Sequence, residues 1–519
     1  MSVNTDHRHQ MSLVTFLFFS IAGGGFILRS IINQYTNWGY NSWILYLVAT
    51  LIYAIPYTFM VIELSSIKQL RESESGYQTW LNLILGRKMG FIAGFFYFYV
   101  NIFYFVDLLP NVLTYGLYTI YADVEYVTAL TTQAWFKPII SISSISLFWL
   151  ATYVSMKGPK WLATLLSFAG YAGFSLTIVF LVSAVFKLST GTIMSNGVPV
   201  VPKYYEAMDL SWGMIASMSW ALQSLGGLEA LAAYKRNIRG GERSFRIGLL
   251  LNVTLFSIVM IACALLTNMI LPAEQAAKLG LLSAIYVVFQ QLGFPMWWTN
   301  VIAFFLLLTT LCGSLMLWTA APVKMLFVDA PKGIFGEKLS ETNHEGTPIN
   351  ALKLQGILVT IIIIIFMLGQ MNAESGINSI LVAVKNLNGG AATLPVLFML
   401  AGYIKLRWDS NNPEYARDFY FLGKGRLFAS LAVIPIVIIF SAATFTALVP
   451  APELWVENFG GTLIQFILGP MSIIAVTIYC SIIFDRWRVK NPHDHSHFNV
   501  ISTENTKEDK IKLDTQELM

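Results

Sequence analysis

Apolar runs of about 20 residues recur along the whole chain, and they constrain its fold more than any other feature. A helix of that length crosses a hydrocarbon layer of roughly 30 Å, and we count about twelve such runs. The composition agrees, because 56% of the residues are hydrophobic and only 12% are charged. Little sequence remains for a soluble domain. We therefore expect an all-α integral membrane protein with about 12 transmembrane helices.

The runs fall into two halves. In the first half we expect spans at 11–33, 42–63, 90–121, 138–156, 161–186 and 210–231. In the second half we expect spans at 247–271, 295–323, 352–371, 377–404, 427–449 and 461–484, with amphipathic segments near 77–88 and 273–291. The first run lacks a small-residue cleavage site and leads directly into the next span, so we interpret it as a membrane helix and not as a signal peptide.

Basic residues gather on one side of the predicted membrane. With an even number of spans and the N terminus inside, about 27 of the 33 Lys and Arg residues lie in cytoplasmic loops and tails. The opposite loops hold acidic or neutral residues such as Asp123, Glu125 and Glu453. This distribution predicts a multi-pass protein of the cell (plasma or inner) membrane with cytoplasmic tails at 1–10 and 485–519. The net charge of +4 needs no nucleic-acid partner.

Glycine clusters interrupt the first and sixth spans, at Gly23-Gly24-Gly25 and Gly226-Gly227. Glycine costs about 1 kcal/mol relative to alanine inside a helix, so each cluster favours local unwinding. Paired breaks of this kind are typical of transporters, where unwound backbone lines a cavity. We expect N–H groups of the first cluster to hold a substrate carboxylate, and carbonyl groups of Leu225, Gly226 and Gly227 to hold its amine. The alternative is close helix packing through small residues.

Four ionisable residues lie deep in predicted spans, namely Arg29, Asp107, Glu229 and Lys385. Burying such a group costs at least about 2.5–3.5 kcal/mol, so each should be paired or face a cavity. Arg29 could bind a substrate carboxylate, snorkel to the outer headgroups or pair with Asp107. Asp107 could attract a substrate amine or serve as the structural partner of Arg29. The aromatic run Phe95 to Phe105 of the same span could provide one wall for the substrate side chain.

Glu229 and Lys385 are the candidates for coupling and gating. Burial in a low-dielectric site favours the neutral form of Glu229 and suits it to sense or carry protons, and the alternative is a hydrogen bond to the loosened backbone. Lys385 could replace a coupling cation or neutralise a nearby acid. It could also be a structural cation in a helix that Gly389-Gly390 makes irregular.

Several motifs resemble the amino acid/polyamine/organocation permeases. Gly23 to Ile27 and Gly226 to Glu229 resemble glycine-rich parts of that superfamily's first and sixth helices, and Lys235 to Gly248 resembles its basic loop between helices six and seven. Other motifs resemble the glutamate:GABA antiporter family within it, and these are Ile55-Pro56, Ile62-Glu63, Glu74 to Trp80, Leu85 to Phe91 and Thr393-Leu394-Pro395.

The resemblance implies a LeuT-type fold, in which two inverted five-helix repeats enclose a central substrate site and two peripheral helices follow. Glu229 matches the family's sixth-helix glutamate. Some amino-acid exchangers carry a tryptophan gate six residues before that glutamate, but this chain has Gln223 there and Trp220 nearly one turn earlier. The expected division is a tail at 1–10, a first repeat at 11–186, an external loop at 187–209, a second repeat at 210–404, two further helices at 405–484 and a tail at 485–519.

Histidines and cysteines bear on ligands and regulation. His493, His495 and His497 alternate along the C-terminal tail, which we interpret as solvated, as a plug that histidine protonation would release, or as an adventitious metal site. The three cysteines lie inside apolar spans and indicate neither a disulfide framework nor a zinc motif. We expect no cofactor and no metal.

These observations favour a secondary active amino-acid transporter that works as an antiporter, exchanging an amino acid for a related amino acid or its decarboxylated amine. The resemblance makes glutamate and GABA the example. The alternative is proton- or sodium-coupled symport. We do not expect a polytopic membrane enzyme or receptor, because no span contains a histidine and no catalytic cluster is evident. The expected partners are a small-molecule substrate and membrane lipid. Arg29 would suit an acidic substrate and Asp107 a basic or amine one.

Overall fold

The computed structural model describes residues 11–492 except 24–26, 71–75, 122, 192–193, 196–197, 200–202, 204, 209, 272–287, 300–304, 332, 344 and 372–375. Nearly all of this part is helical, and its strands are the two-residue pair β1 (Met194–Ser195) and β2 (Val198–Pro199). Ten of its helical segments are long and apolar enough to cross a membrane. The prediction of an all-α, multi-pass membrane protein is confirmed.

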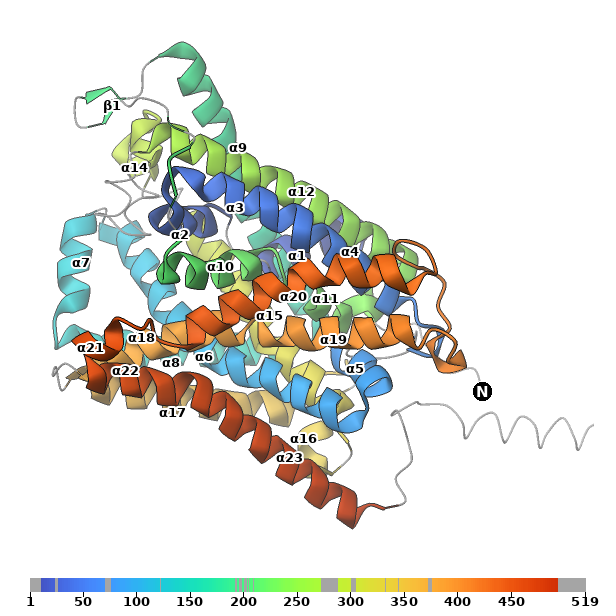
Figure 1. Ribbon diagram of the computed structural model, residues 1–519. Coiled ribbons are helices and arrows are strands. Elements are labelled where there is room, and N and C mark those ends of the chain that lie inside the picture. The colour runs from blue at the N-terminus through green and yellow to red at the C-terminus, as the bar shows by residue number, and fades with distance from the viewer. Residues whose placement is uncertain are drawn as a thin grey trace, which may run out of the picture.

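The order of the helices along the chain is shown by their colours in Figure 1. Those of the first half are α1 (Leu13–Gly23), α2 (Ile27–Trp38), α3 (Ser42–Ala49), α4 (Ile55–Ser65), α5 (Tyr77–Leu85), α6 (Arg87–Tyr121), α7 (Val124–Thr132), α8 (Phe136–Met156) and α9 (Pro159–Thr190). Those of the second half are α10 (Trp212–Ser224), α11 (Leu228–Leu231), α12 (Gly241–Ile270), α14 (Met296–Trp298), α15 (Phe305–Asp329), α16 (Glu337–Ser340), α17 (Ile349–Met371), α18 (Gly376–Ala391), α19 (Leu394–Trp408), α20 (Arg426–Leu448), α21 (Leu454–Glu457), α22 (Phe459–Phe466) and α23 (Ser472–Lys490).

The two spans that contain the glycine clusters are divided into shorter helices. Residues 24–26, which lie outside the described part, separate α1 from α2, and Leu225–Gly227 separate α10 from α11. The amphipathic segment expected near 77–88 contains α5, whereas most of the one near 273–291 lies outside the described residues. The total of twelve spans, the inverted repeats and the domain boundaries remain predictions.

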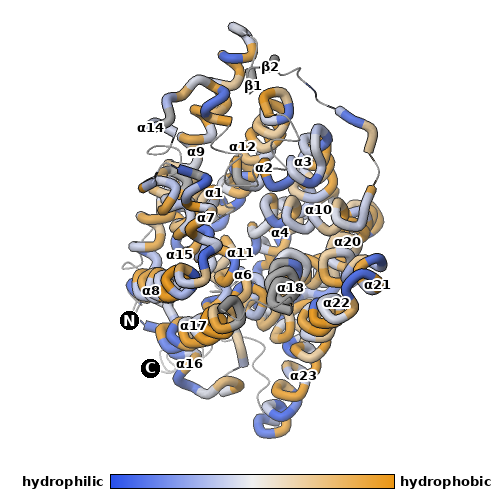
Figure 2. The backbone as a smooth tube through the Cα atoms, turned by 90° about the vertical axis from the view of Figure 1, so that its left-hand side faces the viewer, coloured by the Kyte–Doolittle hydropathy of each residue, from blue (hydrophilic) through white to orange (hydrophobic). Residues whose placement is uncertain are grey.

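The long helices run side by side between two ends of the molecule. In Figure 1, α7, α21 and β1 lie toward the left-hand end, which the sequence predicts to be external, and α5 lies toward the opposite end. Figure 2 looks onto the left-hand side and shows that outer helices such as α17 and α22 are mainly hydrophobic. In the apolar 18-residue stretch of α6, 72% of the residues are buried. In the corresponding stretch of Phe459–Lys490, only 11% are buried. The third span therefore lies in the core and the last lies at the periphery.

The tenth span breaks at a different point from the one expected. The sequence predicts irregularity at Gly389-Gly390, but both residues are helical, and α18 ends before a turn at residues 392–393. A Cβ on Gly389 would lie 2.9 Å from Nε1 of Trp220, and one on Gly390 would lie 2.7 Å from Cγ of Leu448. These glycines therefore allow α18 to pack closely against α10 and α20, and they do not unwind it.

A π-helical turn at Thr50–Ala54 joins α3 to α4 in the second span. Pro56 has no N–H and cannot bond the carbonyl of Ile52, and the N–H of Ile55 bonds the carbonyl of Thr50. The turn carries Tyr53, whose hydroxyl lies beside the break of the sixth span.

Candidate functional site

A cavity of about 800 Å³ lies between helices of both halves, namely α2, α6, α10, α15, α18, α19 and α20. Its lining extends from Glu229, beside the break of the sixth span, to Thr128 in α7 and Leu454 in α21. The cavity therefore opens toward the left-hand end in Figure 1. No described residue of α5, α16 or the loop after α19 lines it.

The backbone of the sixth span is unwound at Leu225–Gly227. Gly227 has a φ of 82°, in the left-handed region that favours glycine, and a Cβ on Gly226 would lie 2.7 Å from the hydroxyl oxygen of Tyr53. Among the described residues, the carbonyl oxygens of Leu225 and Gly226 accept no backbone hydrogen bond. Gly226 and Gly227 line the cavity, whereas Leu225 does not. Backbone groups with free hydrogen-bonding capacity thus adjoin the cavity at the predicted break.

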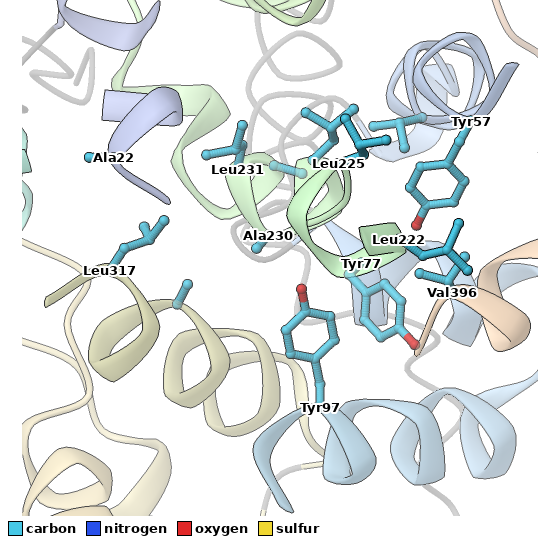
Figure 3. Packing of buried hydrophobic residues seen from close by; sticks show 14 of the residues in the cluster. Ala22, Tyr57, Tyr77, Tyr97, Leu222, Leu225, Ala230, Leu231, Leu317 and Val396 are labelled. Atoms are coloured by element: carbon cyan, nitrogen blue, oxygen red, sulfur yellow. The ribbon is translucent and has the colours of Figure 1, made fainter. Parts of the chain in front are cut away.

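Glu229 lies immediately beyond the break and is 2% exposed. The hydroxyl of Tyr57 donates to its Oε2 at 3.1 Å, and the hydroxyl of Tyr97 donates to its Oε1 at 2.9 Å. Figure 3 shows the rings of Tyr57 and Tyr97 reaching from separate helices toward the segment that carries Leu222 to Leu231. Glu229 lines the cavity, and the donors that hold its carboxyl group are neutral. The group can therefore gain or lose a proton without breaking an ion pair to either tyrosine.

Gln223, the candidate gate, joins two helices of the cavity wall. Its Nε2 donates to the carbonyl oxygens of Gly389, at 2.7 Å, and Asn388, at 3.3 Å. Trp220 lies one turn earlier, against Gly389, and both Gln223 and Trp220 line the cavity. Trp220 is thus one of the tryptophans that line this cavity, while Gln223 ties α10 to α18.

Asp107 lines the cavity from α6, one turn away from Tyr104 and Asn111, which also line it. The side-chain amide of Asn111 donates to the backbone carbonyl of Asp107 at 2.8 Å. Of the aromatic run in this span, Tyr97 and Tyr104 reach the cavity.

For the remaining predicted site residues, the structure describes some of the backbone but not the side chains. Gly23 is the last residue of α1, and Gly24 and Gly25 lie outside the described residues. Arg29 belongs to α2 and Lys385 to α18, but their side chains lie outside the described part of the structure. Carboxylate binding by the first cluster, pairing of Arg29 with Asp107 and a coupling role for Lys385 all remain predictions.

Trp318, in α15, forms part of the site and was not expected from the sequence. Its ring stacks on that of Tyr97 at a centroid distance of 6.2 Å and meets that of Tyr104 edge to face at 6.1 Å. A Cβ on Gly227 would lie 3.4 Å from the indole. The side chain of Asn101 donates to the carbonyl of Trp318. One tryptophan among 14 carries no distinguishing signal, because its role depends on packing between distant spans.

Glu63, at the end of the second span away from the cavity opening, is the centre of a second buried polar cluster. Its carboxylate accepts from Arg407 Nη1 and Arg417 Nε, each at 2.7 Å, from the hydroxyl of Tyr403 at 2.8 Å and from the N–H of Phe421 at 2.9 Å. The Glu63, Arg407 and Arg417 side chains are at most 1% exposed. This cluster joins the second span to the tenth span and to the loop that follows it.

Further contacts close the same end of the molecule. Lys324 Nζ donates to the carbonyl of Ala233 at 3.0 Å. The N–H of Met11 bonds the carbonyl of Asn237 at 2.6 Å, and the N–H of Arg239 bonds the carbonyl of Met11 at 2.8 Å. The segment before α1 is thus tied to the loop after α11, opposite the open end of the cavity.

The described residues contain no group of three His, Cys, Asp or Glu side chains placed to hold a metal ion. Cys263, Cys312 and Cys480 are free thiols. The tail histidines, from His493 onward, lie outside the described residues.

The chain is similar in sequence to known transport proteins. A family model described as amino acid permease matches residues 10–478. The chain is 24% identical to the inner membrane transporter YjeM of Escherichia coli, over 90% of this chain and 95% of the relative. It is also 24% identical to the aspartate/glutamate permease AcaP of Lactococcus lactis, over 80% and 82%. A glutamate/gamma-aminobutyrate antiporter of the same species is 22% identical over 61% of each chain.

Proposed function

Because the chain belongs to the amino acid permease family, we propose that it is a secondary active amino-acid transporter that works as an antiporter. It exchanges an external amino acid for a related amino acid or its decarboxylated amine from inside the cell. Family membership supports an amino acid as the small-molecule substrate. Two relatives carry the names aspartate/glutamate permease and glutamate/gamma-aminobutyrate antiporter, so acidic amino acids and GABA are the first solutes to test.

The observation that carries this proposal is the cavity that ends at a helix break and opens toward one end of the molecule. Alternating access needs a central site that is open to one side while contacts close the other. The cavity reaches the backbone of Gly226 and Gly227, and the Glu63 cluster lies at the closed end. With the N and C termini in the cytoplasm, this conformation faces outward.

Residue roles follow from the lining. Break carbonyls beside Gly226 and Gly227 hold the substrate ammonium, and the first glycine cluster, Gly23 to Gly25, holds its carboxylate. Protonation of Glu229, or the charge of a bound substrate, changes its hydrogen bonds to Tyr57 and Tyr97. Asp107 faces the substrate side chain from α6. Arg29 and Lys385, on α2 and α18, supply the positive charge for an acidic substrate.

Purified full-length protein in liposomes tests the exchange. Vesicles are preloaded with single amino acids or amines, and uptake of each labelled amino acid is compared with uptake into empty vesicles. Uptake that requires one particular internal solute supports exchange and identifies the pair. Uptake into empty vesicles that collapses with a proton or sodium ionophore overturns exchange in favour of coupled symport.

The orientation has its own test. Leu454 lines the open end of the cavity, so a Leu454→Cys variant in intact cells should react with a membrane-impermeant maleimide. Glu341→Cys, in an exposed loop predicted to be cytoplasmic, is the control and should react only after the membrane is permeabilised. The reverse pattern would invert the assignment of inside and outside.

A further inference from the structure

A second, much smaller cavity lies directly behind the break of the sixth span. It measures about 20 Å³ and is bounded by the break residues, by Ser20 in α1 and by Asn252 in α12. Figure 3 labels three of its apolar wall residues, Leu225, Leu231 and Leu317. A space of this size holds one water molecule and nothing larger, because a buried water needs at least about 10–15 Å³.

The polar side chains around this cavity are all more than nine-tenths buried: Ser20 is 4% exposed, Asn252 is 7% and Ser224 is 8%. The side-chain amide of Asn252 donates to the Ser20 hydroxyl at 2.6 Å, which in turn donates to the carbonyl of Leu17 at 2.7 Å. The Ser224 hydroxyl donates to the carbonyl of Ala221 at 2.7 Å. Both hydroxyl donors and one N–H of the Asn252 amide are thus engaged among the described residues, while acceptor capacity remains.

The free acceptors have no protein partner in the described part of the chain. The Oδ1 of Asn252 accepts no hydrogen bond there, nor do the backbone carbonyls of Leu225 and Gly226. Buried polar groups are normally satisfied by protein or by ordered water. A water molecule supplies two donors and fits such a set.

We infer that a single ordered water molecule occupies this cavity and joins the Oδ1 of Asn252 to the unwound backbone of the sixth span. A sodium ion fits less well, because most of the wall is apolar and offers it few oxygen ligands. The water links the break of the sixth span to α12 and, through Ser20, to the end of α1 just before its own break. It thereby fixes the two backbone segments that the proposed function assigns to substrate, and the inference rests on that function for its effect on transport.

The direct test is a cryo-EM map of the full-length protein, at a resolution that shows ordered water, in sodium-containing and in sodium-free buffer. We expect one density peak within hydrogen-bonding distance of Asn252 Oδ1 in both buffers. An empty cavity in both maps overturns the inference. So does a peak that appears only with sodium, above all if uptake is then sodium-dependent.

A functional test uses Asn252→Leu, which removes the Oδ1 acceptor together with the amide bond to Ser20 and fills the space. We expect the apparent substrate affinity in uptake to fall about tenfold, as for the loss of a buried hydrogen bond beside the site. The control is Asn268→Leu on the same helix, where the amide bonds the carbonyl of Tyr40. The control should lower thermal stability and leave KM within about twofold. Equal KM changes in both variants would contradict the inference, and the wild-type maps decide it if Asn252→Leu does not fold.

These outcomes are separable from those of the exchange experiment. Exchange is read from the requirement for an internal solute, and the water site from density in the wild-type protein. A protein that proves to be a symporter can still contain the water, and an antiporter can lack it.

Discussion

Two buried glutamates, Glu63 and Glu229, occupy contrasting environments. Glu63 accepts four hydrogen bonds, two of them from buried arginines, at the closed end of the molecule. Glu229 accepts from neutral donors, among them the hydroxyls of Tyr57 and Tyr97, at the inner end of the cavity. A carboxylate fixed by two cations is committed to one geometry, whereas one held by neutral donors can exchange partners when a ligand or proton arrives. The contrast supports a structural role for Glu63 and agrees with the transport role that we propose for Glu229.

Glu63→Gln has the largest expected effect. It removes the charge that balances Arg407 and Arg417, both of which stay buried, and breaking a buried pair in this way costs about 3–5 kcal/mol. We expect a lower unfolding midpoint of the purified protein in detergent and a lower yield. Glu341→Gln, on an exposed loop, is the control and should leave the midpoint unchanged. A Glu63→Gln protein as stable as the control would remove the structural side of the comparison.

The Glu63 cluster also marks a limit of sequence reasoning. Ile62-Glu63 contributed to a family resemblance, but its partners Arg407 and Arg417 lie 344 and 354 residues away along the chain. A single sequence gives no pairing information over such distances, and the arginines resemble ordinary cytoplasmic charges under the positive-inside rule. The cluster becomes recognisable only when the second and tenth spans are placed side by side.

Glu229→Gln should act in the opposite way. Glutamine keeps the shape: its oxygen can accept from one tyrosine hydroxyl, and its NH2 group can donate to the oxygen of the other, so the unfolding midpoint should change little. Exchange in liposomes should fall at least about tenfold, because the titratable charge beside the break is lost. A fall in midpoint comparable to that of Glu63→Gln, with exchange retained, would assign both glutamates to structure.

The sixth span was more predictable than the cluster around Glu63. A glycine pair and a single carboxylate within an apolar run are local signals. The structure has an unwound segment at Gly226-Gly227, and the buried side chain of Glu229 lines the cavity. The prediction for the tenth span is wrong because the same local signal, Gly389-Gly390, here serves close packing and not unwinding. There the missing Cβ makes room for Trp220 and Leu448, and the helix continues. Composition cannot separate unwinding from close packing.

Tyr97→Phe tests one partner of Glu229 alone. It deletes a hydrogen bond of 2.9 Å to the carboxyl group, and a typical hydrogen bond contributes about 0.5–1.5 kcal/mol. We expect exchange to fall about fivefold to tenfold, which is less than for Glu229→Gln. Tyr77→Phe is the matched control, because the Tyr77 hydroxyl donates to the carbonyl of Pro395 at 3.0 Å. If both variants lower exchange equally, the effect belongs to the aromatic packing around the site and not to the Glu229 bond.

Asp485→Asn should have the smallest effect and sets the baseline for charge removal. Asp485 pairs with Lys88 at 2.7 Å, a distance equal to those between Glu63 and its arginines, but the two side chains are 57% and 40% exposed. Water already solvates both charges, so such a pair contributes about 0–1 kcal/mol and is screened by salt. We expect an unfolding midpoint within error of wild type at physiological salt and unchanged exchange. A large loss of stability here would mean that the N–O distance, and not burial, determines how much these ion pairs contribute. The effect of Glu63→Gln would then not depend on the burial of the Glu63 cluster.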